Sequence, residues 1–255
     1  MKIEIAVATH KEYEMPKSNM YVPMLVGADF NKVTRNYKKD NIGENISYKN
    51  KNYCELTGAY WLWKNSDADI KGLVHYRRHF MSASSKNKDI SDVLTENEII
   101  RYLESSDIIV PKLRKYYIET MWSHYEHSHH IEGLEVTRNV IQKKYPEYLE
   151  SFDNVMKNRS AHMFNMLIAK KEVFDQYHDW LFSVLFEVES NIDITNYSTS
   201  EARIFGYISE LLLDVWLEKE GLEYKEVTVK FMEKQNWFFK GFNFLKRKFI
   251  SNSEI

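Results

Sequence analysis

Short apolar, β-branched segments alternate with longer helical segments along most of this chain. The apolar segments predict strands at residues 2–8, 70–76, 107–111, 162–169 and 223–229. Helical patterns cover residues 53–65, 95–105, 171–189 and 199–219, and two or three further helices fill 115–159. Thr95 and Glu98 form a capping box that marks the start of one helix. This alternation predicts an α/β fold with a mixed or mostly parallel central sheet, flanking helices and a helix-rich C-terminal half.

Length and composition favour one folded domain. The chain has 255 residues, of which 44% are hydrophobic, and this is enough for one large core. No linker rich in Pro, Gly or Ser divides it, so we place one α/β domain at 1–229 and a tail at 230–255. The net charge of −2 argues against a dedicated nucleic-acid binder. Cys54 is the single cysteine, which excludes an internal disulfide framework and a cysteine-rich zinc site.

The N-terminal segment shows no sign of an export signal. It has one Lys and a short strand-like run, without the apolar region and cleavage site of a signal peptide. No stretch reaches the roughly 18 apolar residues that a membrane-spanning helix requires. These features predict a cytoplasmic protein.

A histidine and two arginines follow the strand predicted at 70–76. His75, Arg77 and Arg78 lie at its end, and Thr9 and His10 come directly after the strand at 2–8. Ligands of open α/β sheets bind outside the carboxyl ends of the strands, and Arg side chains bind phosphate oxygens through two parallel hydrogen bonds. The pattern therefore predicts a diphosphate site, although surface arginines paired with acids would give the same sequence.

Two glutamates are candidates for a general base. Glu55 has the apolar neighbours Tyr53 and Leu56, and an isolated carboxylate in such surroundings has a shifted pKa unless it is paired. Glu210 and Arg203 are seven residues apart, close to two helical turns, so they project from one helical face. Glu210 is then either a base positioned by Arg203 or half of a structural ion pair.

Aromatic and histidine residues supply weaker candidates. Trp61 and Trp63 are candidates for stacking on an acceptor sugar, but aromatic residues on a helix belong more often to the core. His124 and His127 in the segment SHYEHSHH share a helical face. Their spacing does not match the zinc motif H-E-x-x-H, so phosphate contact or simple surface exposure is at least as plausible as a metal site.

The sequence implies no firm cofactor. Asp67 and Asp69 form a D-x-D pair, but the pair precedes the strand at 70–76 instead of following it, so we interpret it as a turn. No dinucleotide-binding glycine motif, Walker loop or nucleophile elbow is present in the sequence. We therefore predict no metal-binding residues, and we expect a divalent metal to be dispensable.

The C-terminal tail combines cations with aromatic residues. Residues 230–250 hold six Lys or Arg against one Glu, together with seven aromatic residues. If this segment is helical, its aromatic residues line one face and its cations flank that face, a pattern that predicts contact with an anionic membrane. The alternative is a C-terminal helix that docks on the domain. The residues expected at the membrane are Trp237, Phe238, Phe242, Phe249, Lys240, Arg247 and Lys248.

Six segments, in this order along the chain, resemble a known bacterial family. They are VATHKEYEMP (7–16), DNIGENISYKN (40–50), YCELTGAYWLWKN (53–65), GLVHYRRHF (72–80), SAHMFNMLIAKKEVFDQYHDWLF (160–182) and RIFGYISELLLDVWL (203–217). Together they are similar to the bacterial domain of unknown function 4422, which occurs in capsule, exopolysaccharide and O-antigen gene clusters and includes galactofuranosyltransferases. Glu44 and His79 depart mildly from the family pattern, which often has Asp and Tyr at these positions.

The resemblance implies a glycosyltransferase-like fold for nucleotide sugars and a hexosyltransferase activity. The donor would be a UDP-sugar carrying galactofuranose or galactose, and the acceptor a lipid-linked glycan at the inner face of the cytoplasmic membrane. For such a transferase we expect Thr9 and His10 to line the nucleotide end of the donor and Arg203 to contact its nucleotide or sugar, and we expect Asn45, Lys49 and Asn50 to order a loop over the donor. Two other functions stay open. One is a sugar-nucleotide phosphohydrolase or phosphotransferase that uses the same His and Arg groups, and the other is a non-catalytic scaffold that binds lipid or glycan through the basic tail.

Overall fold

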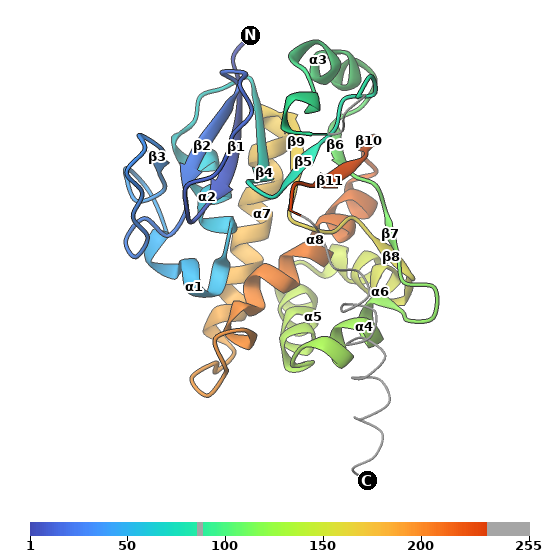
Figure 1. Cartoon of the computed structure of the whole chain (residues 1–255). Helices are drawn as coiled ribbons and strands as arrows, with labels where there is room; N and C mark the ends of the chain where they lie inside the picture. Colours follow the sequence, from blue (N-terminus) through green and yellow to red (C-terminus); the bar gives the residue numbers. More distant parts are fainter. Residues whose placement is uncertain (86–88, 234–255) are drawn as a thin grey trace.

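A seven-strand path forms the centre of the molecule, which the computed structural model describes for residues 1–85 and 89–233 (Figure 1). The order of the strands is β10-β6-β9-β4-β1-β2-β3, and β5 and β11 form a ribbon that extends from β4. β1 is parallel to β2 and β4, whereas β9 is antiparallel to both β4 and β6. The predicted α/β fold with a mixed sheet is therefore confirmed.

The strands and helices have the following bounds. The strands are β1 (Ile3–Thr9), β2 (Tyr21–Leu25), β3 (Lys38–Lys39), β4 (Ile70–His75), β5 (Arg78–Phe80), β6 (Ile108–Pro111), β7 (Arg114–Lys115), β8 (Ser160–Ala161), β9 (Leu167–Lys170), β10 (Tyr224–Val227) and β11 (Val229–Phe231). The helices are α1 (Asn50–Tyr53), α2 (Leu56–Asn65), α3 (Glu96–Ser105), α4 (Met121–Ser128), α5 (Glu132–Lys144), α6 (Leu149–Lys157), α7 (Lys171–Ser190) and α8 (Ile204–Glu220). Short 3-10 turns are η1 (Ser47–Lys49), η2 (Ile90–Asp92), η3 (Pro146–Tyr148) and η4 (Glu201–Arg203).

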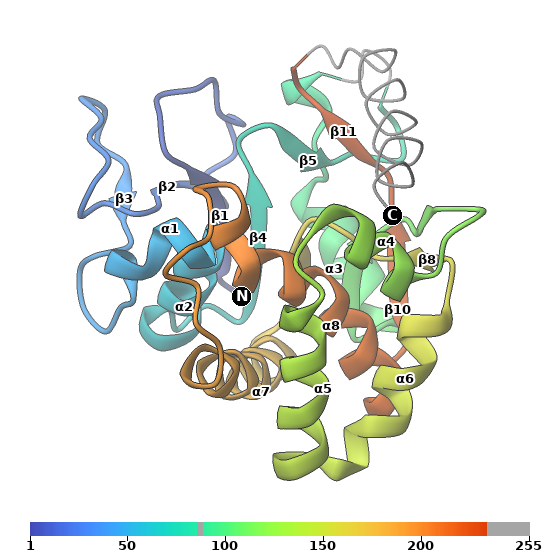
Figure 2. The ribbon, with the colours of Figure 1, turned by 90° about the horizontal axis from the view of Figure 1, so that it is seen from below.

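The two faces of the sheet pack against different helices. In β4, Leu73 belongs to the cluster that includes α2, α7 and α8, whereas Val74 belongs to the cluster that includes α3. Side chains alternate between the faces of a strand, so His75 follows Leu73 to the helix-rich side. Figure 2 looks from below onto the carboxyl ends of β1 and β4 and shows the start of α8 beside them.

β2 contains Pro23, although proline is rarely found in the central strands of a sheet. β3 pairs only with Met24 and Leu25, so at the level of Pro23 the second side of β2 has no partner strand in the described chain. The proline therefore removes no hydrogen bond that the sheet requires.

Two predicted elements have different bounds in the structure. The helix predicted at 53–65 is interrupted at Cys54, whose φ of 54° ends α1 before α2 begins. The strand predicted at 162–169 begins only at Leu167, because Phe164 and Asn165 adopt positive φ angles of 85° and 51°. Both interruptions place side chains in the candidate site described below.

The C-terminal boundary also differs. β11 pairs with β5 through Phe231, so the sheet includes two residues that the sequence analysis assigned to the tail. The predicted membrane residues lie outside the described chain; they are Trp237, Phe238, Lys240, Phe242, Arg247, Lys248 and Phe249. Within the described residues, no helix is long and apolar enough to cross a bilayer.

Candidate active site

The candidate site lies at the carboxyl ends of β1 and β4. These strands are adjacent and parallel, with Ala8 opposite His75, so the segments that follow them meet at one edge of the sheet. His10 contacts the ring of Tyr76 edge-on at 5.4 Å between centroids. Desolvation and the nearby cations Lys11, Arg77 and Arg203 lower the pKa of His10. The predicted convergence of His10 with the arginine segment is therefore present.

Glu55 lies beside His75 in this site. Its Oε1 accepts a hydrogen bond from Asn165 Nδ2 at 2.8 Å and is 3.7 Å from His75 Nε2. Burial lowers the pKa of His75, and the opposing effect of Glu55 does not offset it. Arg78 Nη1 is 3.3 Å from His75 Nδ1, and because a guanidinium has only donors, this ring nitrogen accepts. The ring proton then lies on Nε2, toward Glu55.

Glu210 is the second carboxylate of the site. Burial and the negative charge of Glu55 raise its pKa to about 7, and Arg78 and Arg114 only partly oppose this rise. A carboxyl group with this pKa exists in both protonation states near neutral pH, as a general base requires. Of the two predicted candidates, Glu210 has the environment of a base.

Arg78 packs against two phenyl rings. Its guanidinium carbon is 4.7 Å from the Phe164 ring centroid and 5.0 Å from that of Phe231. Its buried Nε has no hydrogen-bond partner among the described residues, and a buried donor without an acceptor is costly. Arg78 therefore presents an unsatisfied donor in a site that already contains a poised carboxylate.

Arg77 packs over the ring of Tyr76. Its guanidinium carbon is 5.2 Å from the Tyr76 ring centroid, and Nη1 is 3.5 Å from Glu233 Oε2. Thr9 is buried, and its hydroxyl donates to the carbonyl of Lys11, so it shapes the turn after β1. Thr9 thus has a structural role in this turn, in addition to its predicted place at the nucleotide end.

Arg203 does not pair with Glu210, contrary to one prediction. It caps the start of α8, and its Nε donates to Cys54 Sγ at 3.1 Å. The helix begins after Arg203, so the two-turn spacing does not bring the two side chains into an ion pair. Burial raises the pKa of Cys54 to about 12, which keeps the thiol protonated and a poor nucleophile at neutral pH.

His124 and His127 share one buried carboxylate. Both Nδ1 atoms contact Glu119, at 2.9 Å and 3.0 Å. The His124 ring lies 4.1 Å from that of Tyr116, over which Arg114 extends at 5.0 Å. Tyr116 and Arg114, which lie beside His124, also interact electrostatically with Glu210. Among the described residues, no group of three or more His, Cys, Asp or Glu is arranged to hold a metal ion.

The predicted loop residues contact the protein itself. Lys49 Nζ contacts both carboxylate oxygens of Glu189 at 2.6 Å, and Asn50 Nδ2 donates to the Cys54 carbonyl at 2.6 Å. Asn45 Nδ2 donates to the Gly43 carbonyl at 2.8 Å. These contacts fix the loop on α1 and α7, and they give the three residues a structural explanation that the sequence did not supply.

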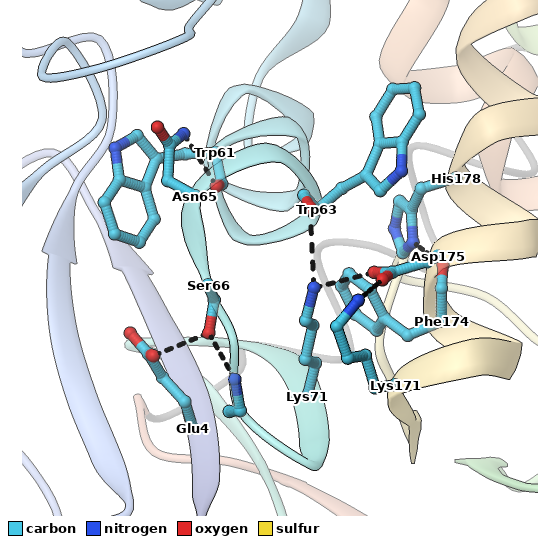
Figure 3. Close-up of polar contacts among 11 residues, drawn as sticks. Glu4, Trp61, Trp63, Asn65, Ser66, Lys71, Lys171, Phe174, Asp175 and His178 are labelled. Atoms are coloured by element: carbon cyan, nitrogen blue, oxygen red, sulfur yellow. Dashed lines mark hydrogen bonds and ion pairs between the residues drawn. The ribbon is translucent and has the colours of Figure 1, made fainter.

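Trp61 is a core residue and Trp63 is partly buried against the core, so both have structural contacts, and their role in acceptor stacking stays a prediction. Trp61 is buried, and its Nε1 donates to the carbonyl of Ile42 at 2.6 Å. Trp63 stacks on Phe182 at 5.8 Å, and its carbonyl accepts from the buried Lys71 at 3.4 Å (Figure 3). Lys71 lies near the amino end of β4, so this region is at the opposite end of the strand from His75.

Sequence reasoning missed Asn165, Glu119 and Arg114. The asparagine itself could have indicated a break in the strand at Asn165, because Asn tolerates left-handed backbone conformations better than most residues. The apolar segment around it instead indicated a continuous strand. Glu119 and Arg114 carry no local signature, since their roles come from contacts with side chains of other elements.

Comparisons with known proteins agree with this architecture. The apo structure of WbbM, described as a bifunctional glycosyltransferase, superposes with a TM-score of 0.83 and 29% sequence identity. The match covers 92% of this chain and 46% of that one, so this chain spans about half the length of WbbM. No curated protein is significantly similar. A family model described as Domain of unknown function (DUF4422) matches residues 4–221, and the chain therefore belongs to the DUF4422 family, as its sequence segments predicted.

Proposed function

We propose that this protein is a glycosyltransferase that moves a hexosyl unit from a UDP-sugar to a lipid-linked glycan. The sugar is galactofuranose or galactose, and the pathway is bacterial surface-polysaccharide synthesis. The observation that carries the proposal is the presence in one site of Glu210, whose pKa is raised to about 7, and of Arg78, which acts electrostatically on Glu210 and whose Nε has no acceptor in the described chain. The likeness to a glycosyltransferase over 92% of the chain supports the same activity.

The diphosphate of the donor binds at the arginine segment. Arg78 supplies its unsatisfied Nε, and Arg77 exchanges its partly exposed contact with Glu233 for a phosphate oxygen. Such a half-exposed ion pair contributes little, so replacing it costs little. His10 and the ring of Tyr76 lie next to these cations, where the nucleoside end of the donor would follow.

The transfer step uses Glu210 as the base. The acceptor hydroxyl oxygen forms a bond to the anomeric carbon, and its proton passes to a Glu210 oxygen. The bond between the anomeric carbon and the diphosphate oxygen breaks, and its electron pair leaves with UDP. Arg77 and Arg78 stabilise the negative charge that develops on the diphosphate. Glu55, held by Asn165, orients His75 in the same site.

The first experiment measures binding of the donor. Thermal unfolding is followed with UDP-galactofuranose, UDP-galactose, UDP-glucose and GDP-mannose, each with and without manganese. A ligand that binds the native state raises the unfolding temperature as its concentration exceeds its dissociation constant. Stabilisation by a UDP-galactose isomer, and none by GDP-mannose, is expected.

The second experiment separates transfer from the alternatives. With a lipid-linked acceptor present, UDP release must depend on the acceptor. Release of inorganic phosphate without any acceptor would instead indicate a phosphohydrolase. If no nucleotide sugar stabilises a folded protein that still binds lipid vesicles, the protein is a scaffold and the transferase proposal is wrong.

A further inference from the structure

An exposed apolar group lies on the segment that connects β6 with α4. Leu113, Tyr117 and Ile118 have exposed fractions of 37%, 75% and 63%. No other stretch of six residues in the described chain contains three exposed large hydrophobic side chains. We call residues 112–118 the docking loop; Figure 1 shows β7 and β8, which belong to this region, at one side of the molecule.

The docking loop is held in a defined conformation. The Tyr116 amide donates to the Arg159 carbonyl at 2.8 Å, and Arg159 Nη1 donates to the Tyr117 carbonyl at 3.1 Å. Tyr117 has a φ of 56°, which is unfavourable for a non-glycine residue and persists only where surrounding contacts enforce it. The protein thus maintains a strained backbone that exposes apolar side chains to solvent.

Cations surround this apolar group. The exposed residues Lys112, Arg114 and Lys115 lie in the loop itself, and the exposed residues Lys157 and Arg159 lie beside it on the β8 side. None of the five forms an ion pair with an acid in the part of the chain that the structure describes. The loop contains no acidic residue, so its positive charge is not offset within the segment.

We propose that the docking loop binds the surface of an anionic lipid bilayer. Tyrosine and aliphatic side chains enter the boundary between headgroups and acyl chains, and flanking Lys and Arg side chains bind anionic headgroups. Protein–protein interfaces are depleted in lysine, so a loop with two lysines among its seven residues fits a bilayer better than a protein partner.

The docking loop also bears on how the proposed transferase meets its acceptor. This part of the inference rests on the proposed function. Arg114 lies over Tyr116 and lowers the pKa of Glu210 against the effect of burial. The positive charge of the docking loop therefore acts on the catalytic carboxylate. Binding of the bilayer here brings the sugar end of a lipid-linked acceptor to Glu210.

The test compares two isoleucines with equal exposure. Ile118 and Ile42 are both 63% exposed, and Ile42 lies in the segment after β3, on the other side of the sheet from β7 (Figure 1). The full chain, Ile118→Ser and Ile42→Ser are sedimented with vesicles of equal parts phosphatidylglycerol and phosphatidylcholine, without substrates. We expect Ile118→Ser to lower the partition coefficient about ten-fold, because an apolar side chain leaves the interface. Ile42→Ser should match the parent.

A second pair of variants tests the charges. Lys115→Ser is expected to lower binding to the same vesicles about five-fold, the effect of about 1 kcal/mol for each interfacial cation. Lys32→Ser, an exposed lysine between β2 and β3, is the matched control. Added salt should weaken the parent's binding, and vesicles of phosphatidylcholine alone should bind it less.

The outcomes separate this proposal from the proposed function. If Ile118→Ser and Ile42→Ser bind vesicles equally, or if anionic and neutral vesicles bind equally, the docking loop is not a lipid site. Stabilisation by UDP-sugars is measured on the same variants and is expected to be unchanged. Loss of vesicle binding by Ile118→Ser supports the docking loop even if no UDP-sugar stabilises the protein.

Discussion

Asn165 Nδ2 donates to Glu55 Oε1 at 2.8 Å and joins two helices that the sequence leaves unconnected. The same amide donates to the Gly206 carbonyl at 3.0 Å, and its Oδ1 accepts from Ser209 Oγ at 2.8 Å. Glu55 precedes α2, whereas Gly206 and Ser209 belong to α8, where Gly206 lies about one turn before Glu210 and Ser209 directly precedes it. One buried amide therefore fixes the distance between the two carboxylates.

Replacing this amide tests that role. Asn165→Asp retains the tolerance for a positive φ but places a carboxylate against Glu55. We expect a loss of stability of about 1–3 kcal/mol, because a buried hydrogen bond becomes a repulsion, and a lower kcat. Chemical denaturation and UDP release measure the two effects. Asn154→Asp is the control, since Asn154 makes the equivalent contact to Glu218 at the surface. If Asn165→Asp and Asn154→Asp lost the same stability and the same rate of UDP release, Asn165 would have no special role in the site.

Glu210 should control the pH dependence of transfer. Burial and Glu55 raise its pKa to about 7, and a base acts only when deprotonated, so kcat should rise as pH increases through about 7. Glu210→Gln should abolish this rise and lower kcat at least about 100-fold. A pH profile of UDP release checks both statements. If UDP release by Glu210→Gln showed the same apparent pKa as the parent, another residue would be the base.

The same shift predicts an effect on stability. A carboxyl whose pKa is raised on folding contributes stability that is fully present below its unfolded pKa and is lost as pH rises through about 7. Glu210→Gln removes this buried charge, so the variant should unfold at a higher temperature than the parent at pH 8 and not at pH 5. Each kcal/mol corresponds to about 2–4 °C for a chain of this size. A lower unfolding temperature at pH 8 would contradict the assignment.

Arg78 should act on the leaving group. Arg78→Ala is expected to lower kcat about 100- to 1,000-fold, as removal of a single preorganised donor does in other transfer enzymes. Arg138→Ala is the control, because Arg138 pairs with Asp153 on the surface at 2.8 Å. UDP release at saturating donor is the measurement. If Arg78→Ala released UDP at the parent's rate, Arg78 would not stabilise the leaving diphosphate.

Lys71 and Asp175 form a buried pair at the amino end of β4 (Figure 3). Lys71 Nζ is 2.7 Å from Asp175 Oδ1, and burial lowers the pKa of Lys71. Asp175→Ala leaves this cation buried without its carboxylate and should cost about 3–5 kcal/mol, whereas Lys71→Met, with Asp175 still bound to Lys171, should be close to neutral. Urea unfolding measures both. If both variants lost the same unfolding free energy, the Lys71 side chain would contribute stability beyond its ion pair with Asp175.

The strands at the centre of the sheet were predictable because their signal is local. Residues 2–8 and 70–76 are apolar and β-branched, and buried strands of parallel sheets have this composition. The strand ends then identified His10, His75, Arg77 and Arg78 as candidates, because ligand sites occur at that edge. The structure brings these residues together.

Residues 162–166 could not be predicted in the same way. Their composition is that of a strand, but Phe164 contacts Arg78 and Phe231, and Asn165 contacts Glu55 and α8. These long-range contacts stabilise positive φ angles that the local sequence disfavours. The break at Cys54 likewise lies where Gly206 of α8 packs against its side chain.

Local sequence patterns were enough to predict the family and the mixed α/β fold, and they identified one edge of the sheet as the candidate ligand site. Only contacts in the folded chain raise the pKa of Glu210, bury Trp61 with Trp63 packed against the core, and place Arg203 against Cys54 instead of Glu210. The reason is physical: strand and helix patterns arise from neighbours in sequence, whereas desolvation and ion pairing depend on groups that meet only in the folded chain.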